Sequence, residues 1–311
     1  MFGKKIPKNS SCVGIDIGTN SIKAIELSRS GENCEIRKIA IKELPPEKTK
    51  GTLLETLKSI KQDMNLSAKD VYIALSGPAV TMRFINMPEM SQSDLKNSLR
   101  YEADKYIPYT IDEVVVDSHI LEKAGQSKQM RVLLVAAKKD IINSRINLFK
   151  ELGLAVKLID VDAFSMFNNF EYVNKGLEKD KNIALLNMGH SFTNLLIFRD
   201  ASPYFTRDIQ IGAKDMIPPE NVLSNLVNEI RLSFGYYENQ YGSSIEKIFI
   251  SGGLSCSPDT IKFLGENFDA KPETWDPFRN FSPDSTIASK VSDKDKPLFA
   301  VACGLALRNT D

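Results

Sequence analysis

The amino-acid sequence predicts an α/β protein of two related domains that face one ligand, and three observations support this. The stretch VGIDIGTNSIKAIEL (residues 13–27) has the pattern of a buried strand with one acid, a glycine-containing turn and a second strand. The stretch IALLNMGHSFTNLLIF (residues 183–198) repeats that plan, with Asn187 in the place of Asp16. Strand and helix patterns alternate through much of the chain, which is typical of α/β proteins. The 311 residues have room for roughly two domains of about 150 residues each.

The composition excludes several classes of protein. Forty lysines and arginines balance forty aspartates and glutamates, so nothing predicts a basic surface for nucleic acid or for an anionic membrane. The longest apolar runs, such as residues 132–137, are far shorter than the ~20 residues that span a bilayer. Residues 1–11 lack the apolar segment of a signal peptide, and we expect a solvated tail there. The four cysteines match no disulfide or zinc spacing, which favours the reducing cytoplasm.

The first domain is expected to begin with the hairpin and to continue as alternating strands and helices. Residues 34–41 alternate between apolar and polar, as a third strand does. A helix is predicted next, and VYIALSG (residues 71–77) follows it as a strand. The apolar positions that predict the helix are Leu53, Leu54, Leu57 and Ile60.

A small α+β insertion of about fifty residues is predicted within the first domain, at about residues 86–136. Ser91 opens a helix that extends through Tyr106, and IPYTIDEVVVDSHIL follows as an extended segment. MRVLLVAA (residues 130–137) then has the pattern of a strand.

The chain is expected to return to the first domain through a helix at residues 139–152, which Gly153 ends. AVKLIDVDAFSMFNNF follows as a strand that runs into a helix. The polar link at residues 174–182 leads to the second hairpin. We therefore place the first domain at residues 1–180 and the second at residues 181–311.

The second domain is expected to contain a long amphipathic helix at about residues 222–241, within a small subdomain at about residues 212–246. IEKIFISGGLSC is predicted to be a strand that leads into a Gly-Gly turn. Residues 266–297 are polar and contain several prolines, which predicts loops. The apolar helix FAVACGLALR closes the domain.

Five of these motifs resemble those of the actin-like ATPase superfamily, and they occur in that superfamily's order. VGIDIGTNS and LLNMGHSFTN resemble its two phosphate loops, and FISGGLSC resembles its adenosine loop. IDVDAFSMF and FAVACGLAL resemble its two connecting helices. The resemblance implies an actin-like (ribonuclease H-like) two-domain fold with a nucleotide cleft, and ATP with Mg²⁺ as the cofactors.

Within the superfamily, EADKYIPYTIDEVVVD and DPFRN resemble the type IV pilus assembly protein PilM family, in the FtsA-like branch. This implies a cytoplasmic ATP-binding component of the inner-membrane assembly platform, with slow or no ATP hydrolysis. The implied partner is the cytoplasmic tail of a PilN-like membrane protein, bound near residues 82–116. That partner would hold the protein at the inner membrane, and self-association is a further expectation.

Two alternatives remain open at this stage. The first is an FtsA-like division or cytoskeletal ATPase. FtsA-type chains continue to a membrane-binding helix, whereas this chain ends a few residues after GLALR, which argues against that reading. The second is a small-molecule kinase of the same superfamily. The sequence offers no convincing catalytic aspartate or substrate loop for one.

The first phosphate loop supplies the candidate metal site. A buried Asp16 is costly without a partner, and a hydrated Mg²⁺ beside a triphosphate would be one. Gly18 lets the backbone approach phosphate oxygens. Lys23 could reach a phosphate or could be a solvated strand lysine. Three further residues offer amides for an anion-binding nest, namely Thr19, Asn20 and Ser21.

The second phosphate loop departs from the superfamily pattern, because Asn187 stands where an aspartate is usual. An asparagine can hold a metal-bound water but brings no negative charge, so metal affinity and hydrolysis should both be weakened. Gly189 and Ser191 are nucleotide-binding candidates in this loop. His190 could contact the γ-phosphate or could be only a polar turn residue.

The remaining candidates come from the other motifs. Asp160 is the predicted catalytic residue and would orient the attacking water. The alternative role is that of an acid at a helix N-terminus, which either Asp160 or Asp162 could fill. The candidates for adenosine binding, the last two by family analogy alone, are Gly252, Gly253, Leu254, Glu229 and Ser233.

Overall fold

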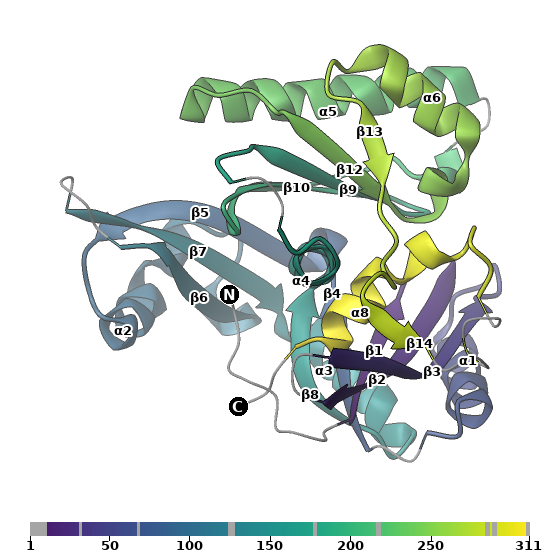
Figure 1. The fold of residues 1–311 in the computed structure, drawn as a ribbon. Helices are drawn as coiled ribbons and strands as arrows, with labels where there is room; N and C mark the ends of the chain where they lie inside the picture. The colour runs from purple at the N-terminus through teal and green to yellow at the C-terminus, as the bar shows by residue number, and fades with distance from the viewer. Residues whose placement is uncertain are drawn as a thin grey trace.

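A computed structural model describes residues 11–308 except 31–32, 67–68, 124–127, 177–178, 216–218, 284–286 and 288–290. The chain forms three separate β-sheets of six, five and three strands, with helices on their faces (Figure 1). This is the actin-like α/β fold that the sequence predicts. Residues 1–10 of the predicted solvated tail lie outside the described residues, and Ser11 is the first residue of strand β1. No helix in the described ranges is long and apolar enough to cross a membrane.

The six-stranded sheet has the order β14-β3-β2-β1-β4-β8. The predicted hairpin forms β1 and β2, which pair antiparallel, while β4 runs parallel to β1. Alternate residues of β1 face opposite layers: Val13 and Ile15 pack towards α1 and α3, and Cys12 packs towards α4 and α8. The strands are β1 (Ser11–Ile17), β2 (Ser21–Ser30), β3 (Asn33–Glu43), β4 (Asp70–Leu75), β8 (Ala155–Val161) and β14 (Phe281–Pro283). The helices are α1 (Lys50–Asp63), α3 (Lys139–Glu151), α4 (Asp162–Val173) and α8 (Ala300–Ala306).

The five-stranded sheet has the order β11-β10-β9-β12-β13, and the second hairpin forms β9 and β10. Helices α5 and α6 cover its outer face, and α4 lies between its inner face and the six-stranded sheet (Figure 1). Its strands are β9 (Ile183–Met188), β10 (Thr193–Arg199), β11 (Ser202–Ile209), β12 (Lys247–Ser251) and β13 (Pro272–Thr274). Its helices are α5 (Pro219–Tyr241) and α6 (Pro258–Asn267). The sequence patterns did not predict β11 or α6.

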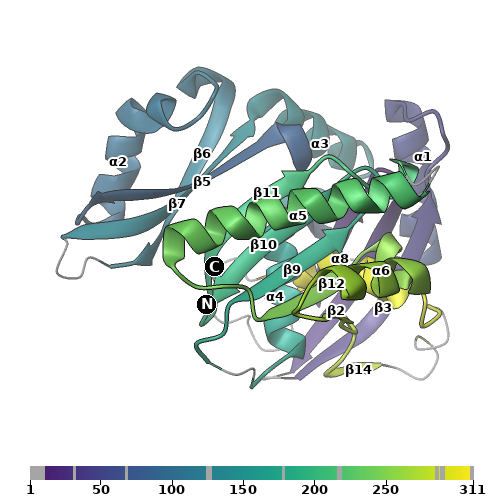
Figure 2. The ribbon, with the colours of Figure 1, turned by 90° about the horizontal axis from the view of Figure 1, so that it is seen from above.

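The three-stranded sheet is the predicted α+β insertion, and it projects to one side of the molecule (Figures 1 and 2). The insertion consists of β5 (Val80–Pro88), α2 (Gln92–Glu102), β6 (Val114–Glu122) and β7 (Gln129–Lys138), and β7 is the central strand of its sheet. The structure extends this unit to residues 80–138, because β5 already pairs along its whole length with β7. The α-helix ends at Glu102, and a short 3₁₀ turn follows in place of the predicted helical continuation to Tyr106.

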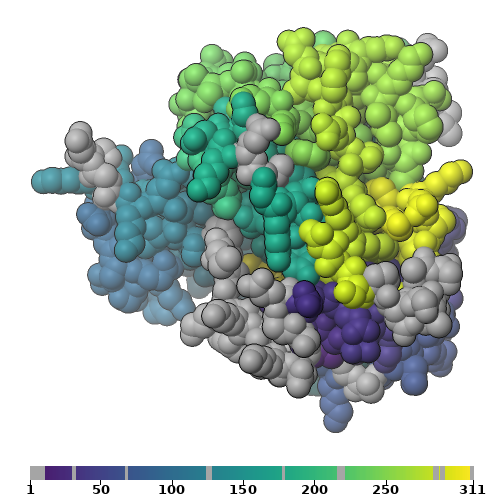
Figure 3. Space-filling view, viewed as in Figure 1, coloured from purple at the N-terminus to yellow at the C-terminus, as the bar shows by residue number. Residues whose placement is uncertain are grey.

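The last part of the chain returns to the six-stranded sheet. Strand β14 pairs parallel with β3, and α8 packs on β1 and α4. The space-filling view shows surface residues of this last part of the chain, in yellow, between the purple first strands and the green second sheet (Figure 3). Two glycines permit the close approach of α8. A Cβ on Gly14 would lie 2.2 Å from the Ala302 oxygen, and one on Gly304 would lie 1.6 Å from the Ser165 oxygen. The single division at residue 180 stays a prediction.

Candidate functional site

The turns of the two hairpins face one cavity of about 270 Å³ between the six-stranded and five-stranded sheets. Twelve of the predicted residues line it, namely Asp16, Gly18, Thr19, Asn20, Ser21, Lys23, Asn187, Gly189, His190, Ser191, Gly252 and Gly253. The others that line it are Ile41, Glu43, Asp162, Phe192, Asn194, Ala213, Asp295 and Leu298. We refer to this cavity as the cleft. The clustering of residues so distant in sequence makes it the candidate nucleotide site.

The first hairpin places an ion pair in the cleft. Asp16 and Lys23 are cross-strand neighbours on β1 and β2, and Lys23 Nζ lies 3.2 Å from Asp16 Oδ2. Both side chains are buried, so Lys23 is the partner that the buried Asp16 has in this structure. A Cβ on Gly18 would lie 2.9 Å from Lys23 Nζ and 3.0 Å from the Ser21 oxygen. Glycine at this position therefore leaves room for the Lys23 ammonium above the turn.

The second hairpin and the strand on each side of it carry a row of hydrogen-bonded polar side chains, one on each of the four strands. We call this row the polar rung. It consists of Ser251, Asn187, Asn194 and Asp208, which pair laterally on β12, β9, β10 and β11. Ser251 Oγ donates to Asn187 Oδ1 at 3.4 Å, and Asn187 Nδ2 donates to Asn194 Oδ1 at 3.3 Å. Asn194 Nδ2 donates to Asp208 Oδ1 at 2.6 Å. The Gly77 amide donates to Asp208 Oδ2 at 2.9 Å, so the rung ends on the link between β4 and β5.

The structure separates the two acids at the start of α4. Asp160 does not line the cleft; it lies near Arg308, with Arg308 Nε 2.9 Å from its Oδ2. Burial raises the pKa of Asp160, and Arg308 opposes that shift. Asp162, the first residue of α4, is the acid that faces the cleft. Burial, followed by the nearby Asp16, raises the pKa of Asp162 to about 7.

The side of the cleft beside His190 is positively charged. Burial and then the nearby Lys48 and Lys214 lower the pKa of His190, so the imidazole is mostly neutral at pH 7. The Lys214 amide donates to the His190 oxygen at 2.8 Å, which fixes this turn. Neither lysine was predicted from the sequence, because each lies outside the motifs. Together they offer positive charge to an anionic ligand.

The Gly-Gly turn closes the other side of the cleft. Gly252 has a φ of +83°, and a Cβ on it would lie 2.6 Å from the Met188 oxygen. Gly253 lines the cleft beside it, whereas Leu254 packs into the core of the five-stranded sheet. Glu229 and Ser233 do not line the cleft, and both contact Arg207. The structure therefore brings the two glycines to the site and leaves these three predicted residues outside it.

The charges that line the cleft fit a nucleotide that carries a divalent cation. Four carboxylates line it, from Asp16, Glu43, Asp162 and Asp295, against the single lysine Lys23. These carboxylates would repel a bare triphosphate, and a bound Mg²⁺ would add to the positive charge of Lys23, Lys48 and Lys214 in offsetting that repulsion. Within the described ranges no three His, Cys, Asp or Glu side chains are arranged to hold a metal on their own. Magnesium is commonly held by substrate phosphates and waters with one or two carboxylates, which Asp16 and Asp162 can supply.

The Asp162→Asn variant is expected to become more stable relative to the parent protein as the pH rises from about 4 to 7. The folded pKa of Asp162 is about 7, above the unfolded value near 3.9, so between these pH values the unfolded state releases a proton that the folded state keeps, and the parent protein loses stability. About three pH units at ~1.4 kcal/mol each place the gain at pH 8, relative to pH 4, at roughly 3–4 kcal/mol, measured by urea unfolding across this range.

The matched control is Asp259→Asn, at the exposed first turn of α6. It should leave the pH dependence of unfolding unchanged. A parallel pH dependence in the Asp162→Asn and parent proteins would contradict the raised pKa.

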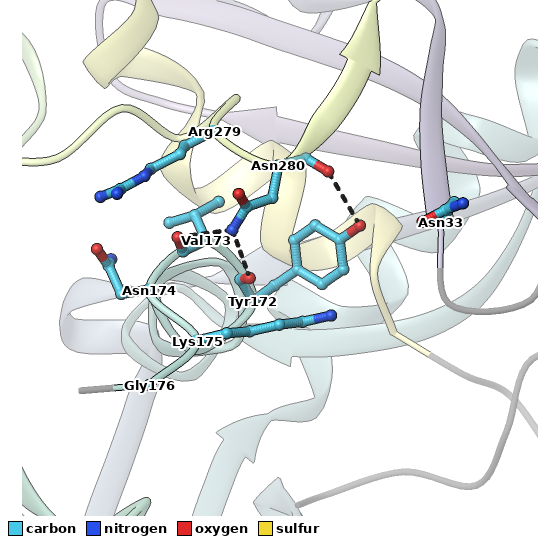
Figure 4. Close-up of a pocket in the computed structure, with 8 residues that line it drawn as sticks. All are labelled: Asn33, Tyr172, Val173, Asn174, Lys175, Gly176, Arg279 and Asn280. Atoms are coloured by element: carbon cyan, nitrogen blue, oxygen red, sulfur yellow. Dashed lines mark hydrogen bonds between the residues drawn. The ribbon is translucent and has the colours of Figure 1, made fainter. Parts of the chain in front are cut away.

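A second cavity, of about 600 Å³, lies at the C-terminal end of α4, away from the phosphate loops (Figure 4). Asn280 Nδ2 donates to the Val173 oxygen at 2.9 Å and to the Tyr172 oxygen at 3.4 Å. The Tyr172 hydroxyl donates back to the Asn280 oxygen at 3.4 Å. These bonds cap α4 and join it to the segment that leads into β14. We interpret this corner as structural.

Comparisons with known proteins agree with this geometry. The family described as type IV pilus assembly protein PilM matches residues 14–218 and 219–310. A solved structure of a "PilM-PilN type IV pilus biogenesis complex" is similar over 95% of this chain and 97% of its own, with 24% identity and a TM-score of 0.84.

More distant structures share the fold. The ethanolamine utilization protein EutJ from Carboxydothermus hydrogenoformans is 10% identical over 98% of this chain and 92% of its own, with a TM-score of 0.54. A Bacteroides thetaiotaomicron protein described as having an actin-like ATPase fold is 11% identical over 87% of this chain and 92% of its own, also with a TM-score of 0.54.

Proposed function

The chain belongs to the type IV pilus assembly protein PilM family, and from that premise we propose that it binds magnesium–ATP in its cleft and the cytoplasmic tail of a PilN-like membrane protein. In this role it is the cytoplasmic, actin-like component of the pilus assembly platform. Its partner holds it at the inner membrane. The observation that carries the nucleotide half of the proposal is the convergence of two phosphate-loop turns on one cleft.

Different residues of the cleft would contact different parts of the nucleotide. The amides of residues 19–21 and the Lys23 ammonium would hold phosphate oxygens. Asp16 and Asp162 would orient waters around Mg²⁺, which would neutralise part of the phosphate charge. Gly252 and Gly253 would allow the adenosine to lie close to the backbone.

The same residues favour holding ATP over consuming it. Asn187 brings no charge to the second loop, and its amide group is already part of the polar rung. Asp162 is partly protonated near pH 7, which weakens it as a metal partner. We therefore propose slow or no hydrolysis.

The partner half of the proposal places the PilN-like tail near residues 82–116, where the inserted sheet adjoins the first domain. The similar solved structure is that of a complex between PilM and PilN, which supports the choice of partner. Val115 lies at this end of the inserted sheet, since it pairs with Ala137 just before α3, and it is 47% exposed. An exposed aliphatic side chain at such a junction is suited to an apolar peptide contact.

The Val115→Asp variant is therefore expected to bind the tail at least about tenfold more weakly, because a charge would replace an apolar contact. The measurement is fluorescence polarisation with a labelled peptide of the cytoplasmic tail of the PilN-like protein encoded with this chain. A scrambled peptide serves as the specificity control.

The matched variant is Leu232→Asp, an aliphatic side chain that is 64% exposed on α5, far from the junction in sequence. It should bind the tail as the parent protein does. Absence of binding by the parent, with or without magnesium–ATP, would refute the partner, and equal binding by both variants would refute the site.

A further inference from the structure

A buried arginine joins the inserted sheet to the five-stranded sheet. Arg131, on β7, donates to the Pro203 oxygen at 2.6 Å, to Ser202 Oγ at 2.9 Å and to Glu122 Oε1 at 2.7 Å. Its guanidinium lies 3.8 Å from the centre of the Tyr204 ring, and the Tyr204 hydroxyl donates to Glu122 Oε1 at 2.7 Å. We call these five residues the Arg131 clasp. Such a combination of charge-assisted bonds and a cation–π contact fixes both position and orientation.

The other end of the same strand reaches the cleft. β11 begins with the clasp residues and ends near Asp208, which belongs to the polar rung and accepts the Gly77 amide. The two ends are about 20 Å apart, at ~3.3 Å per residue over six residues. Gly77 opens the short turn that leads directly into β5. Strand β11 is thus bonded to the inserted sheet at one end and to the turn that precedes β5 at the other, and it runs beside β5 and β7 (Figure 2).

We propose that β11 couples nucleotide in the cleft to the position of the inserted sheet, through the polar rung at one end and the Arg131 clasp at the other. The inference rests on the proposed function, because it requires nucleotide in the cleft. It adds the route by which that nucleotide acts on the region proposed to hold the partner peptide.

The volume of the cleft indicates why the two hairpins should move when a nucleotide binds. Its volume of about 270 Å³ lies at the lower edge of the ~300–1,000 Å³ usual for small-ligand pockets, so we expect the two hairpins to move apart when a whole nucleotide binds. At the cleft end of β11, the Gly77 amide of the first domain donates one hydrogen bond to Asp208. At the clasp end, three hydrogen bonds and the stacking of Arg131 on the Tyr204 ring join β11 to the inserted sheet. When the hairpins separate, the Gly77–Asp208 bond therefore breaks before the clasp does, and the inserted sheet moves with β11.

The burial of Arg131 also favours a clasp that is either fully formed or fully broken. Arg131 is 8% exposed, so a partly opened clasp would leave a charged group buried without its partners. The clasp is therefore formed or broken as a unit, which is the behaviour that coupling between two sites requires.

The test is hydrogen–deuterium exchange with and without magnesium and the non-hydrolysable analogue AMP-PNP. In the parent protein, nucleotide should slow exchange in the cleft hairpins and, by at least about fivefold, in β5 and β7. Arg131→Met keeps the aliphatic stem and removes the clasp bonds. It should retain the protection of the hairpins and show less than about a twofold change in β5 and β7.

The matched control is Arg199→Met. Arg199 also stacks on the Tyr204 ring, with a distance of 5.3 Å, and donates to the Tyr204 hydroxyl at 3.5 Å, but it lies on β10 of the same sheet and makes no hydrogen bond to the described residues of the inserted unit. It should respond as the parent does. Glu122→Gln, at a side chain that is 46% exposed, provides a second variant if Arg131→Met does not fold, and its β5 and β7 response should fall between those of the other two.

Three outcomes separate this inference from the proposed function. Absence of protection in the hairpins of every variant would refute nucleotide binding, and both proposals with it. Protected hairpins with no response of β5 and β7 in the parent would overturn the coupling alone. An undiminished β5 and β7 response in Arg131→Met would overturn the role of the clasp.

Discussion

Replacement of Asp16 by alanine is expected to abolish magnesium–ATP binding, with an affinity loss of at least about 100-fold, or ~2.7 kcal/mol. Asp16 is one of two buried carboxylates that can orient the waters of Mg²⁺, and the other, Asp162, is partly protonated near pH 7. No other group at the site would supply full negative charge at this position. Isothermal titration calorimetry at pH 7.5 with magnesium–ATP measures the effect.

A second consequence of the same change can be separated from the first. Without Asp16 the buried Lys23 ammonium loses the carboxylate that lies 3.2 Å away, which lowers the stability of the fold. The double variant Asp16→Ala with Lys23→Met removes both charges and should recover stability without recovering ATP affinity. Asp70→Ala, at an exposed ion pair on β4, is the control and should bind ATP normally. Unchanged ATP affinity in Asp16→Ala would refute the site.

The Gly304→Ala variant is expected not to fold, or to lose more than about 4 kcal/mol of stability. A Cβ at this position would lie 1.6 Å from the Ser165 oxygen and 2.4 Å from its carbonyl carbon, so α8 and α4 would have to move apart. Both helices are buried in the core between the two large sheets, where small displacements propagate. Thermal unfolding followed by circular dichroism, together with the yield of folded protein, measures the effect.

The control for this prediction is Gly265→Ala in α6. A Cβ there meets nothing within 4 Å, so the change should be neutral or should stabilise the helix by up to about 1 kcal/mol. A melting temperature of Gly304→Ala within about 2 °C of the parent, corresponding to less than ~1 kcal/mol, would show that the two helices are not in backbone contact.

The fold and most of the cleft could be predicted because their signals are local. The two hairpins contain their own turn residues, and each of the five motifs fits within a dozen residues. The choice between Asp160 and Asp162 could not be made in the same way. The two acids stand on either side of the point where β8 becomes α4, and a shift of that boundary by one residue would change which side chain faces the cleft.

The polar rung and the Arg131 clasp depend instead on lateral contacts between distant segments. Asp208 meets Asn194 only because β11 pairs with β10 in one register, and β11 itself was not predicted. Arg131 and Tyr204 are separated by 73 positions and meet only through the packing of two sheets. A single sequence contains no local pattern that reports such contacts.

The return of β14 and α8 to the first sheet has a consequence for the order in which the chain can fold during synthesis. The ribosome releases the N-terminal strands first, yet their edge at β3 and the face above β1 are completed only by residues 281–306. The five-stranded sheet, between residues 183 and 274, can assemble while those surfaces are still uncovered. The first half of the chain therefore cannot complete its fold until the last part has been synthesised. A nascent chain stalled before residue 281 would expose apolar surface to chaperones and proteases.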